Sequence, residues 1–315
     1  MTRLHFMPQK LVVVAYAVSP EEGATEAVLD LIQRSGGEVD SHNWVRVTES
    51  ASDGQATDVE GYNALTVHAD APSVDHLRNA LQPNRREQLL PGVDLNVIDA
   101  RWFDNSRRKL LVTDVDSTLI RQEVIEMLAA HVGLEAEVAA VTERAMRGEI
   151  DFEQSLRERV AVLKGLPASV IDEVSSSVRL SPGATVLVKT LLGSGHAVAA
   201  VSGGFNQILD PLAEKLDLTR AAANTLDIED GKLTGRVTGG VVDREAKARL
   251  LSQWAEELDV APEDVIAVGD GANDIDMCRA AGLSVAYRAK PALRDVADTQ
   301  LSIPNLDALR FFVDL

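Results

Sequence analysis

A short apolar run, Leu110-Leu111-Val112, is followed by two aspartates, Asp114 and Asp116. Such a run is typical of a buried strand in a parallel sheet, and ligands of open α/β sheets bind beyond the carboxyl ends of the strands. Because side chains alternate along an extended chain, both carboxylates are predicted to point to one side. Two anions this close need a cation between them, a shared proton or two different roles. For this segment alone, the alternative is a solvated turn that caps the next helix.

From Arg108 onward, predicted strands alternate with predicted helices, which is the pattern of an α/β fold with a doubly wound parallel sheet. Residues 121–182 follow the first strand and are predicted to be helical, so that they form a cap over the active edge of the sheet. Asp230-Gly231 predicts a hairpin over 224–237. The expected parallel strands are 109–113, 196–201, 265–268, 284–287 and 301–303.

The N-terminal segment, residues 1–103, is predicted to be a small α+β domain that precedes a larger domain over 104–315. Its apolar runs and turn residues indicate the order βαββαβ, with a polar loop over 49–60 and two helices on one face of a sheet. This segment carries no paired carboxylates and no phosphate loop, which favours a regulatory or pairing role. It resembles an ACT domain, a small-ligand sensor, with the segment 19–23 in place of the usual glycine-containing turn.

The charge balance limits the partners of the chain. Its 49 acidic and 31 basic residues give a formal net charge of -18, which opposes binding to nucleic acid or to an anionic membrane. The first six residues lack the apolar core of a signal peptide, and no later segment is long and apolar enough to span a bilayer. The single cysteine, Cys278, is expected to be a small buried residue. These features favour a cytoplasmic protein.

Three further segments each offer a group that phosphoryl transfer requires. Ser202-Gly203-Gly204-Phe205 follows a predicted strand and offers a hydroxyl and glycine amides to phosphate oxygens. The loop Gly269-Asp270-Gly271-Ala272-Asn273-Asp274 offers two carboxylates and an amide, and hard oxygen ligands of this kind suit Mg²⁺. Lys247 adds a point charge for a phosphate. Taken singly, each has a plain structural interpretation: a loop, a helix cap or a solvated lysine.

Together these segments resemble the haloacid dehalogenase superfamily. Its signature is an aspartate nucleophile, a second acid two residues later, a Ser or Thr, a Lys and an acidic metal loop, and all occur here in that order. The resemblance covers 109–315, about two thirds of the chain. The loops at Ser202 and Asp270, and residues 152–160 of the expected cap, are similar to the phosphoserine phosphatase branch of the superfamily.

The resemblance implies Mg²⁺-dependent hydrolysis of O-phospho-L-serine to L-serine and phosphate, the last step of serine biosynthesis. Asp114 is expected to attack phosphorus and form an aspartyl-phosphate, and Asp116 to act as general acid and then general base. The metal is expected between Asp114, the backbone carbonyl of Asp116 and Asp270, with Asp274 behind them. The residues expected to bind substrate on the core domain are Ser202, Gly203, Lys247 and Asn273.

Phosphoserine carries an ammonium and a carboxylate beside its phosphate, so a selective pocket needs one acid and one base outside the phosphate site. Glu123 is expected to pair with the ammonium and Arg159 to bind the carboxylate through its planar fork. Met146 and Phe152 are expected to form apolar walls. Arg157 lies two residues from Arg159 and is expected to point elsewhere on the helix.

Two alternatives remain for the activity. The same mechanism could serve another small phosphomonoester, or the acidic pocket could hold phosphate without turnover, as a phosphoryl-accepting sensor. Asp116 argues against the sensor, because a second acid promotes release of the phosphoryl group. The N-terminal sheet is also expected to have an exposed edge strand, which favours a homodimer.

Overall fold

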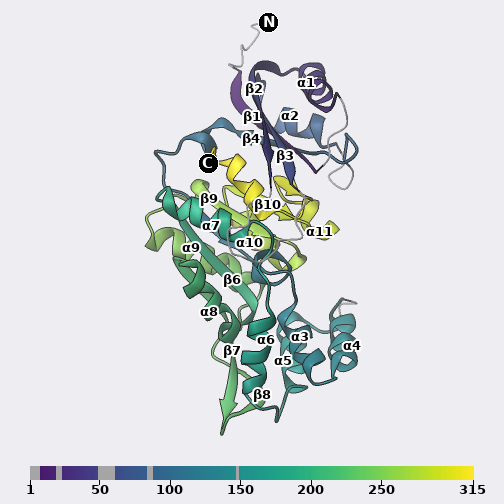
Figure 1. The fold of residues 1–315 in the computed structure, drawn as a ribbon, viewed down its shortest axis with the longest axis vertical. Coiled ribbons are helices and arrows are strands. Elements are labelled where there is room, and N and C mark those ends of the chain that lie inside the picture. The colour runs from purple at the N-terminus through teal and green to yellow at the C-terminus, as the bar shows by residue number, and fades with distance from the viewer. Residues whose placement is uncertain (1–7, 19–22, 49–60, 84–87, 147–148) are drawn as a thin grey trace, which may run out of the picture.

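The computed structural model describes residues 8–18, 23–48, 61–83, 88–146 and 149–315. These residues form two sheets: a four-stranded sheet of order β2-β3-β1-β4 and a seven-stranded sheet of order β11-β10-β9-β5-β6-β7-β8. The small sheet lies at one end of an elongated molecule, the large sheet in the middle and a group of helices at the other end (Figure 1). The predicted loop over 49–60 and most of the segment 19–23 lie outside the described residues.

The N-terminal sheet has the predicted βαββαβ order, and all of its strand pairs are antiparallel. One face buries Val13, Leu65 and Val97 against Ile32 and Leu77 of its two helices. Period-2 alternation in the strands and helical spacing in the helices place these residues on facing surfaces. The elements are β1 (Gln9–Ala17), α1 (Ala24–Arg34), β2 (Glu38–Val47), β3 (Tyr62–Ala71), α2 (Val74–Leu81) and β4 (Asp94–Asp99).

The other face of the small sheet is buried against the C-terminal segment. The Tyr16 hydroxyl donates to the carbonyl of Ala308 at 2.6 Å, and the Tyr62 hydroxyl donates to the Asp307 carboxylate at 2.9 Å. Both rings lie edge-on to Phe311, with centroids 6.3 Å away. The small sheet and the C-terminal segment therefore share a buried interface in which both tyrosine hydroxyls are hydrogen-bonded.

The large sheet is the predicted doubly wound sheet, with one antiparallel strand at its edge. Alternate residues of its strands pack to opposite faces: Leu111 and Val198 toward α7 and α8, Val112 and Ala199 toward α9 and α10. The strands are β5 (Leu110–Thr113), β6 (Ala197–Phe205), β7 (Arg220–Glu229), β8 (Lys232–Thr238), β9 (Val265–Gly269), β10 (Leu283–Tyr287) and β11 (Thr299–Leu301). The helices are α7 (Ala184–Gly193), α8 (Asn206–Leu216), α9 (Arg244–Glu257), α10 (Ile275–Ala280) and α11 (Pro291–Arg294).

Two of the expected parallel strands have bounds that differ from the prediction by more than one residue, and the first strand of the hairpin begins at Arg220 rather than at Asn224. The last strand was expected over 301–303 but spans Thr299–Leu301, because the Ser302 amide donates to the Asp94 carboxylate of the N-terminal domain rather than to a neighbouring strand. β6 was expected to end at Val201 but continues to Phe205, which lies opposite Asn224 of β7. Contacts between distant segments thus decided both ends.

The insertion between β5 and β6 is helical, as predicted, and consists of α3 (Val124–His131), α4 (Glu135–Met146), α5 (Phe152–Ala161) and α6 (Ser169–Ser177). Its two connections to the core run side by side. Ile120 lies opposite Leu180, and the Ser181 amide donates to the carbonyl of Leu119 at 2.9 Å. This paired hinge places the cap directly beyond the carboxyl end of β5.

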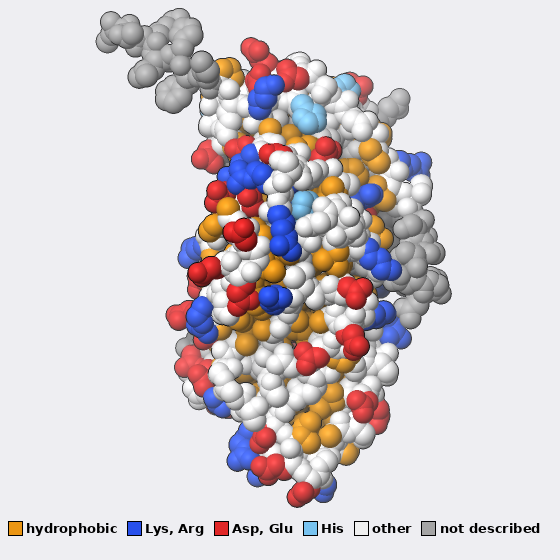
Figure 2. Space-filling model, turned by 90° about the vertical axis from the view of Figure 1, so that its left-hand side faces the viewer, with side chains coloured by type: hydrophobic (Ala, Val, Ile, Leu, Met, Phe, Trp, Pro, Cys, Tyr) orange, Lys and Arg blue, Asp and Glu red, His pale blue; other side chains and the backbone are white. Residues whose placement is uncertain are grey.

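The surface is charged, and acidic and basic side chains are interspersed along the face in Figure 2. No helix within the described ranges has both the length and the apolar character needed to cross a membrane. Cys278 is buried, as predicted, and burial raises the pKa of its thiol well above the usual range.

Candidate active site

The chain makes an irregular turn where β5 ends, η2 (Val115–Leu119), with Asp114 at its start and Asp116 within it. Ser117 lies in the left-handed region at φ 57°, and its amide donates to the carbonyl of Gln122 at 3.1 Å. The Asp114 amide donates to the carbonyl of Val268 in β9 at 2.9 Å, so the turn is fixed to the neighbouring strand. The two aspartates are therefore held by a turn rather than by the simple extended alternation that we predicted.

Asp114 is buried, with 3% of its surface exposed. Its Oδ1 accepts hydrogen bonds from the Val115 amide at 2.7 Å and from Lys247 Nζ at 2.6 Å. Its Oδ2 lies 3.5 Å from Nδ2 of Asn273. Burial and then the charge of Asp274 raise the pKa of Asp114 well above its ordinary value, and Lys247 acts in the opposite direction. One oxygen of this carboxylate is thus anchored, and the other is bound only weakly.

Lys247 is fully buried on α9 and lies between two carboxylates. Its Nζ donates to Asp114 at 2.6 Å and to Asp274 at 2.7 Å. Burial alone would lower the pKa of this lysine, but the two carboxylates outweigh burial and raise the pKa above its ordinary value. The lysine is therefore a fixed positive charge in the site, not a solvated surface residue.

Asp116 lies between the cap hinge and the loop at Ser202. Its Oδ2 accepts from Ser202 Oγ at 2.9 Å, and its Oδ1 accepts from the Val124 amide at the start of α3 at 2.8 Å. Burial and then the nearby charge of Glu123 raise the pKa of Asp116 to about 6. A carboxyl group with this pKa exchanges its proton close to neutral pH, which a general acid and base requires.

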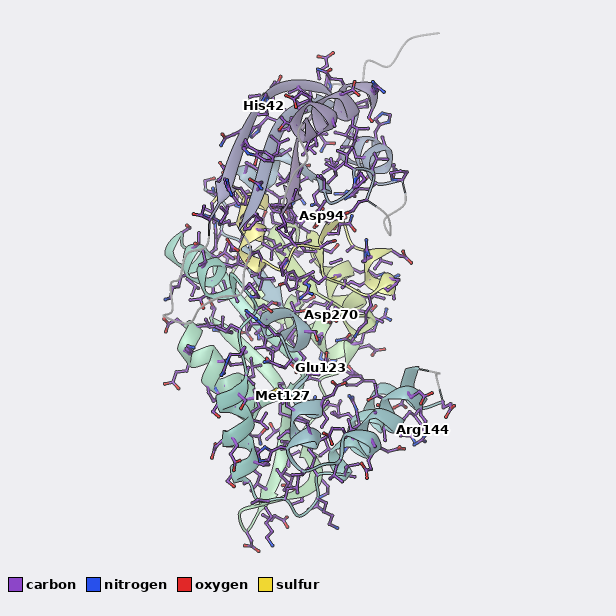
Figure 3. The ribbon with its side chains drawn as sticks, turned by 45° about the vertical axis from the view of Figure 1, so that its right-hand side comes forward. His42, Asp94, Glu123, Met127, Arg144 and Asp270 are labelled. Carbon is purple, nitrogen blue, oxygen red and sulfur yellow. The ribbon has the colours of Figure 1, made fainter. Side chains whose placement is uncertain are left out.

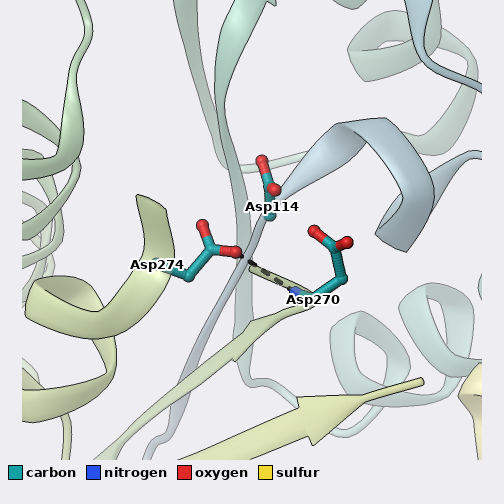
Figure 4. Close-up of side chains that lie close together, drawn as sticks. All are labelled: Asp114, Asp270 and Asp274. Atoms are coloured by element: carbon teal, nitrogen blue, oxygen red, sulfur yellow. Dashed lines mark hydrogen bonds between the residues drawn. The ribbon is translucent and has the colours of Figure 1, made fainter. Parts of the chain in front are cut away.

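The loop after β9 brings two further aspartates to the same edge (Figure 4). Asp274 is fully buried, and its Oδ2 accepts from the amides of Asp270 and Gly271, both at 3.1 Å. Together with the bond from Lys247, these bonds give Asp274 a structural role in shaping the loop. Within the part of the chain that the structure describes, the Asp270 carboxylate pairs only with Lys290, whose Nζ lies 3.5 Å away, and burial raises the pKa of Asp270.

Asp114, Asp270 and Asp274 each offer an oxygen, and these oxygens all lie within 4.8 Å of one another. Carboxylates are the hard ligands that Mg²⁺ and related cations prefer. Three acids in so small a buried volume also face only one fully buried cation, Lys247, among the described residues. This donor set fits a divalent metal ion.

The loop at Ser202 is packed so closely that only glycine fits at its centre. A Cβ at Gly204 would lie 2.7 Å from Oδ2 of Asp116, and a Cβ at Gly203 would lie 2.9 Å from Cζ of Phe152. Ser202 is buried, and its Oγ accepts from the Gly204 amide at 2.7 Å. The backbone of this loop therefore approaches both the second aspartate and the first residue of α5.

Residues of the helical cap also contribute to the site. Phe152 contacts Gly203, as just described, and Ser117 Oγ donates to Glu123 Oε1 at 2.7 Å. Burial lowers the pKa of the half-buried Arg159, whereas the charges of Glu123 and Asp116 raise it, and its Nε donates to the carbonyl of Ser155 at 3.3 Å. In Figure 3, Glu123 and Asp270 lie at the junction of the cap and the large sheet, whereas Arg144 lies on the outer part of the cap.

The structure thus brings nearly every predicted site residue together at the carboxyl edge of the large sheet, beneath the cap. The exception is Met146, whose side chain lies outside what the structure describes. Arg157 is exposed and pairs with Glu153 at 2.7 Å, away from the crevice, as expected from its place on the helix. Sequence reasoning missed Asn224, a buried residue whose Nδ2 donates to the carbonyl of Gly203 at 2.9 Å. Only its place in the hairpin pattern was visible in the sequence.

The fold is that of a capped α/β protein, a doubly wound sheet with a helical cap. Its site combines a buried aspartate paired with a lysine and an acidic loop, as in enzymes that transfer phosphoryl groups. The profile of the haloacid dehalogenase-like hydrolase family matches residues 111–279, more than half of the chain. The chain belongs to the haloacid dehalogenase-like hydrolase family.

Several named relatives lie within one branch of this family. A phosphoserine phosphatase from Lactococcus lactis is 47% identical over 205 residues, which cover 65% of this chain and 95% of the relative. One from Streptomyces coelicolor is 54% identical over 224 residues, 71% of this chain and 54% of the relative. The crystal structure of a probable phosphoserine phosphatase from Vibrio cholerae aligns with 96% of this chain. The alignment covers 86% of the Vibrio cholerae chain, with 33% sequence identity and a TM-score of 0.73. The chain spans about half the length of the relatives from Streptomyces coelicolor and Mycobacterium tuberculosis.

Proposed function

We propose that the protein hydrolyses O-phospho-L-serine to L-serine and phosphate, as the last step of serine biosynthesis, and that it requires Mg²⁺. The observation that carries the proposal is the pair of aspartates: one is anchored through a single oxygen to Lys247, and the other has a pKa of about 6 and a hydrogen bond from Ser202. A nucleophile and a proton carrier two residues apart are what stepwise phosphoryl transfer needs. The names of the relatives, which are phosphoserine phosphatases, support phosphoserine as the substrate.

In the first step, Oδ2 of Asp114 attacks phosphorus while the bond from phosphorus to the serine oxygen breaks. Asp116 donates its proton to that oxygen, so serine leaves as a neutral alcohol. In the second step, Asp116 removes a proton from water, which attacks phosphorus and releases the Asp114 carboxylate. Lys247, Ser202, the Gly203 amide and Asn273 stabilise the negative charge on the phosphoryl oxygens.

Asp114, Asp270 and the backbone carbonyl of Asp116 would hold the metal ion, and Asp274 would support them from behind through its bonds to Lys247 and the loop amides. A bound Mg²⁺ supplies positive charge to the phosphoryl oxygens and offsets the repulsion between the acids. These residues also orient the loop that carries Asn273.

The first test is phosphate release from O-phospho-L-serine against a panel of small phosphomonoesters, with Mg²⁺ and with a chelator. We expect phosphoserine to give the highest kcat/KM, release to stop when the metal is removed, and activity to return when Mg²⁺ is added back. Equal turnover of the whole panel would indicate a phosphatase that acts on another small phosphomonoester. A stable phosphoprotein with no released phosphate would identify the phosphoryl-accepting sensor instead.

Glu123 and Arg159 are the residues that would select phosphoserine, by binding its ammonium and its carboxylate. Replacing Arg159 with Met removes a charged, two-pronged contact worth about 1.5–3 kcal/mol, so the ratio of kcat/KM for phosphoserine to that for methyl phosphate should fall about ten- to a hundredfold. Arg157→Met is the matched control, because Arg157 lies on the same helix and pairs with exposed Glu153. An equal ratio in the two variants would show that Arg159 does not bind substrate.

We also propose that the protein is cytoplasmic and has two domains, an ACT-like module over 1–103 and a phosphatase domain over 104–315. A homodimer is supported by β2, whose outer edge has no partner strand among the described residues and whose residues are largely exposed, including Trp44 at 40%. Free strand edges pair readily with one another. Sedimentation equilibrium should therefore give twice the chain mass, and Trp44→Asp with Val45→Pro should give the mass of one chain.

A further inference from the structure

The β7–β8 hairpin extends from the edge of the large sheet and lies against the cap (Figure 1). The segment that joins α5 to α6 runs antiparallel to β8, with Pro167 opposite Lys232. Backbone hydrogen bonds fix the distance between the hairpin and the end of α5. These bonds run from the Gly165 amide to the Leu233 carbonyl, from the Leu233 amide to the Leu166 carbonyl and from the Ala168 amide to the Gly231 carbonyl, each at 2.8 Å.

Gly235 of β8 lies against the end of α5 and the turn that follows it. A Cβ at this position would lie 2.8 Å from Cβ of Lys164 and 3.3 Å from Cα of Ala161. Neither atom is the free end of a side chain that could rotate away, because both are fixed to the cap backbone. Any side chain at this position must therefore push the end of α5 away from the hairpin.

The same hairpin is anchored at its other end to the phosphate-binding loop. Asn224 is buried in β7, where its Nδ2 donates to the carbonyl of Gly203 at 2.9 Å and its Oδ1 accepts from the Val242 amide at 2.8 Å. Buried amides with both partners satisfied hold the backbone firmly. The hairpin is thus a rigid connection between the loop below the crevice and the helix above it.

Helix α5 carries two residues that we assign to the substrate pocket. Phe152 is its first residue and contacts Gly203, whereas Arg159 lies in its last turn, two residues before Ala161. A helix moves as a unit over this length, so a displacement at Ala161 and Lys164 also displaces the guanidinium of Arg159. The hairpin does not contact the substrate groups that these residues would bind. Through α5, it nevertheless sets the position of both side chains.

We propose that the β7–β8 hairpin is a strut that sets the position of α5 over the crevice, and that Gly235 is a positioning residue for substrate selection. The proposal rests on the proposed function, since the place of Arg159 matters only for a substrate with a group that it binds. Asp114 and Lys247, which lie at the start of η2 and on α9, are not part of α5, so we expect them to keep their geometry when α5 moves.

The test compares Gly235→Ala with Gly239→Ala. Gly239 follows the same strand and has a similar φ of 76°, against 79° for Gly235, but no atom lies within 4 Å of its added Cβ. Both variants therefore carry the same backbone strain, and only one presses on the cap. For Gly235→Ala we expect KM for phosphoserine to rise by about tenfold or more, with kcat for methyl phosphate close to that of the parent. Gly239→Ala should match the parent with both substrates.

Amide hydrogen exchange supplies a readout that needs no substrate. Residues 152–168 should exchange faster in Gly235→Ala than in Gly239→Ala. Equal KM values and equal exchange in the two variants would overturn the strut, as would an activity loss of the same size with both substrates. If the parent releases no phosphate from phosphoserine, the proposed function fails, and the exchange comparison alone then supports or overturns the strut.

Discussion

Asp114→Asn is expected to release no measurable phosphate from phosphoserine, a loss of about 10⁴-fold or more, because the amide cannot serve as the nucleophile. Acid-quenched mixtures of the parent protein and substrate should contain a phosphorylated chain, detected by its mass, and the variant should not. Substrate binding should survive, because Ser202, Lys247 and Arg159 all remain. Isothermal titration of the variant with phosphoserine measures that binding.

The same substitution should leave the fold intact or make it more stable. Burial and Asp274 hold the pKa of Asp114 well above its ordinary value, so the charged form is unfavourable in the folded protein. A neutral side chain of the same shape removes this repulsion, while Lys247 keeps its bond to Asp274 at 2.7 Å. We therefore expect a melting temperature no lower than that of the parent. Asp172→Asn, an exposed change on α6, should alter neither quantity. Phosphate release by Asp114→Asn at the parent's rate would exclude Asp114 as the nucleophile.

The general arrangement of this site was predictable because it depends on local patterns. Apolar runs mark the strands of a parallel sheet, and the residues that follow those runs must meet at one edge. Asp114, Ser202 and Asp270 were brought together by this rule alone. Lys247 needed a different argument, since it lies on a helix and nothing in its neighbourhood marks it as buried.

The contacts that shape the site were not predictable in the same way. The left-handed conformation of Ser117 depends on a hydrogen bond to Gln122, and no residue type in the turn requires it. The ion pairs of Lys247 with Asp114 and Asp274, which lie 133 and 27 residues away in the sequence, were not predicted. A sequence pattern of period 2 or 3.6 carries no information on such pairs.

The interface between the two domains was hidden for a related reason. Tyr16 and Tyr62 fit the alternation of ordinary core strands, yet their hydroxyls bond to Ala308 and Asp307, 292 and 245 residues away. Burial and the charge of Asp307 raise the pKa of Tyr62 above its usual range, as expected for a phenol that donates to a buried carboxylate. An apolar pattern shows that a face is covered, but it does not show which segment covers it.

Lys247→Met is expected to cost both activity and stability, unlike the substitution at Asp114. Methionine has a similar length but no charge, so Asp114 and Asp274 remain buried without their shared cation. Breaking a buried ion pair from one side destabilises a protein by about 3–5 kcal/mol, and phosphoryl transfer should fall at least about 10³-fold with the loss of a positive charge beside phosphorus. Urea unfolding and phosphate release measure the two effects. Lys290→Met is the control for stability, since its side chain is 65% exposed and such surface pairs contribute about 0–1 kcal/mol.

The instability of Lys247→Met should depend on pH in a defined direction. Lys247 acts to lower the pKa of Asp114, so its removal raises that pKa further above the value in the unfolded chain. The folded variant then binds a proton that the unfolded chain does not, and its stability therefore increases as the pH is lowered through the raised pKa. The difference in unfolding free energy between the variant and the parent should thus be largest at high pH and shrink toward acid. Adding Asp114→Asn to Lys247→Met should recover part of the loss, because one of the two uncompensated carboxylates is gone. A difference that stays constant with pH, or a double variant that is less stable than Lys247→Met alone, would show that Lys247 does not balance these acids.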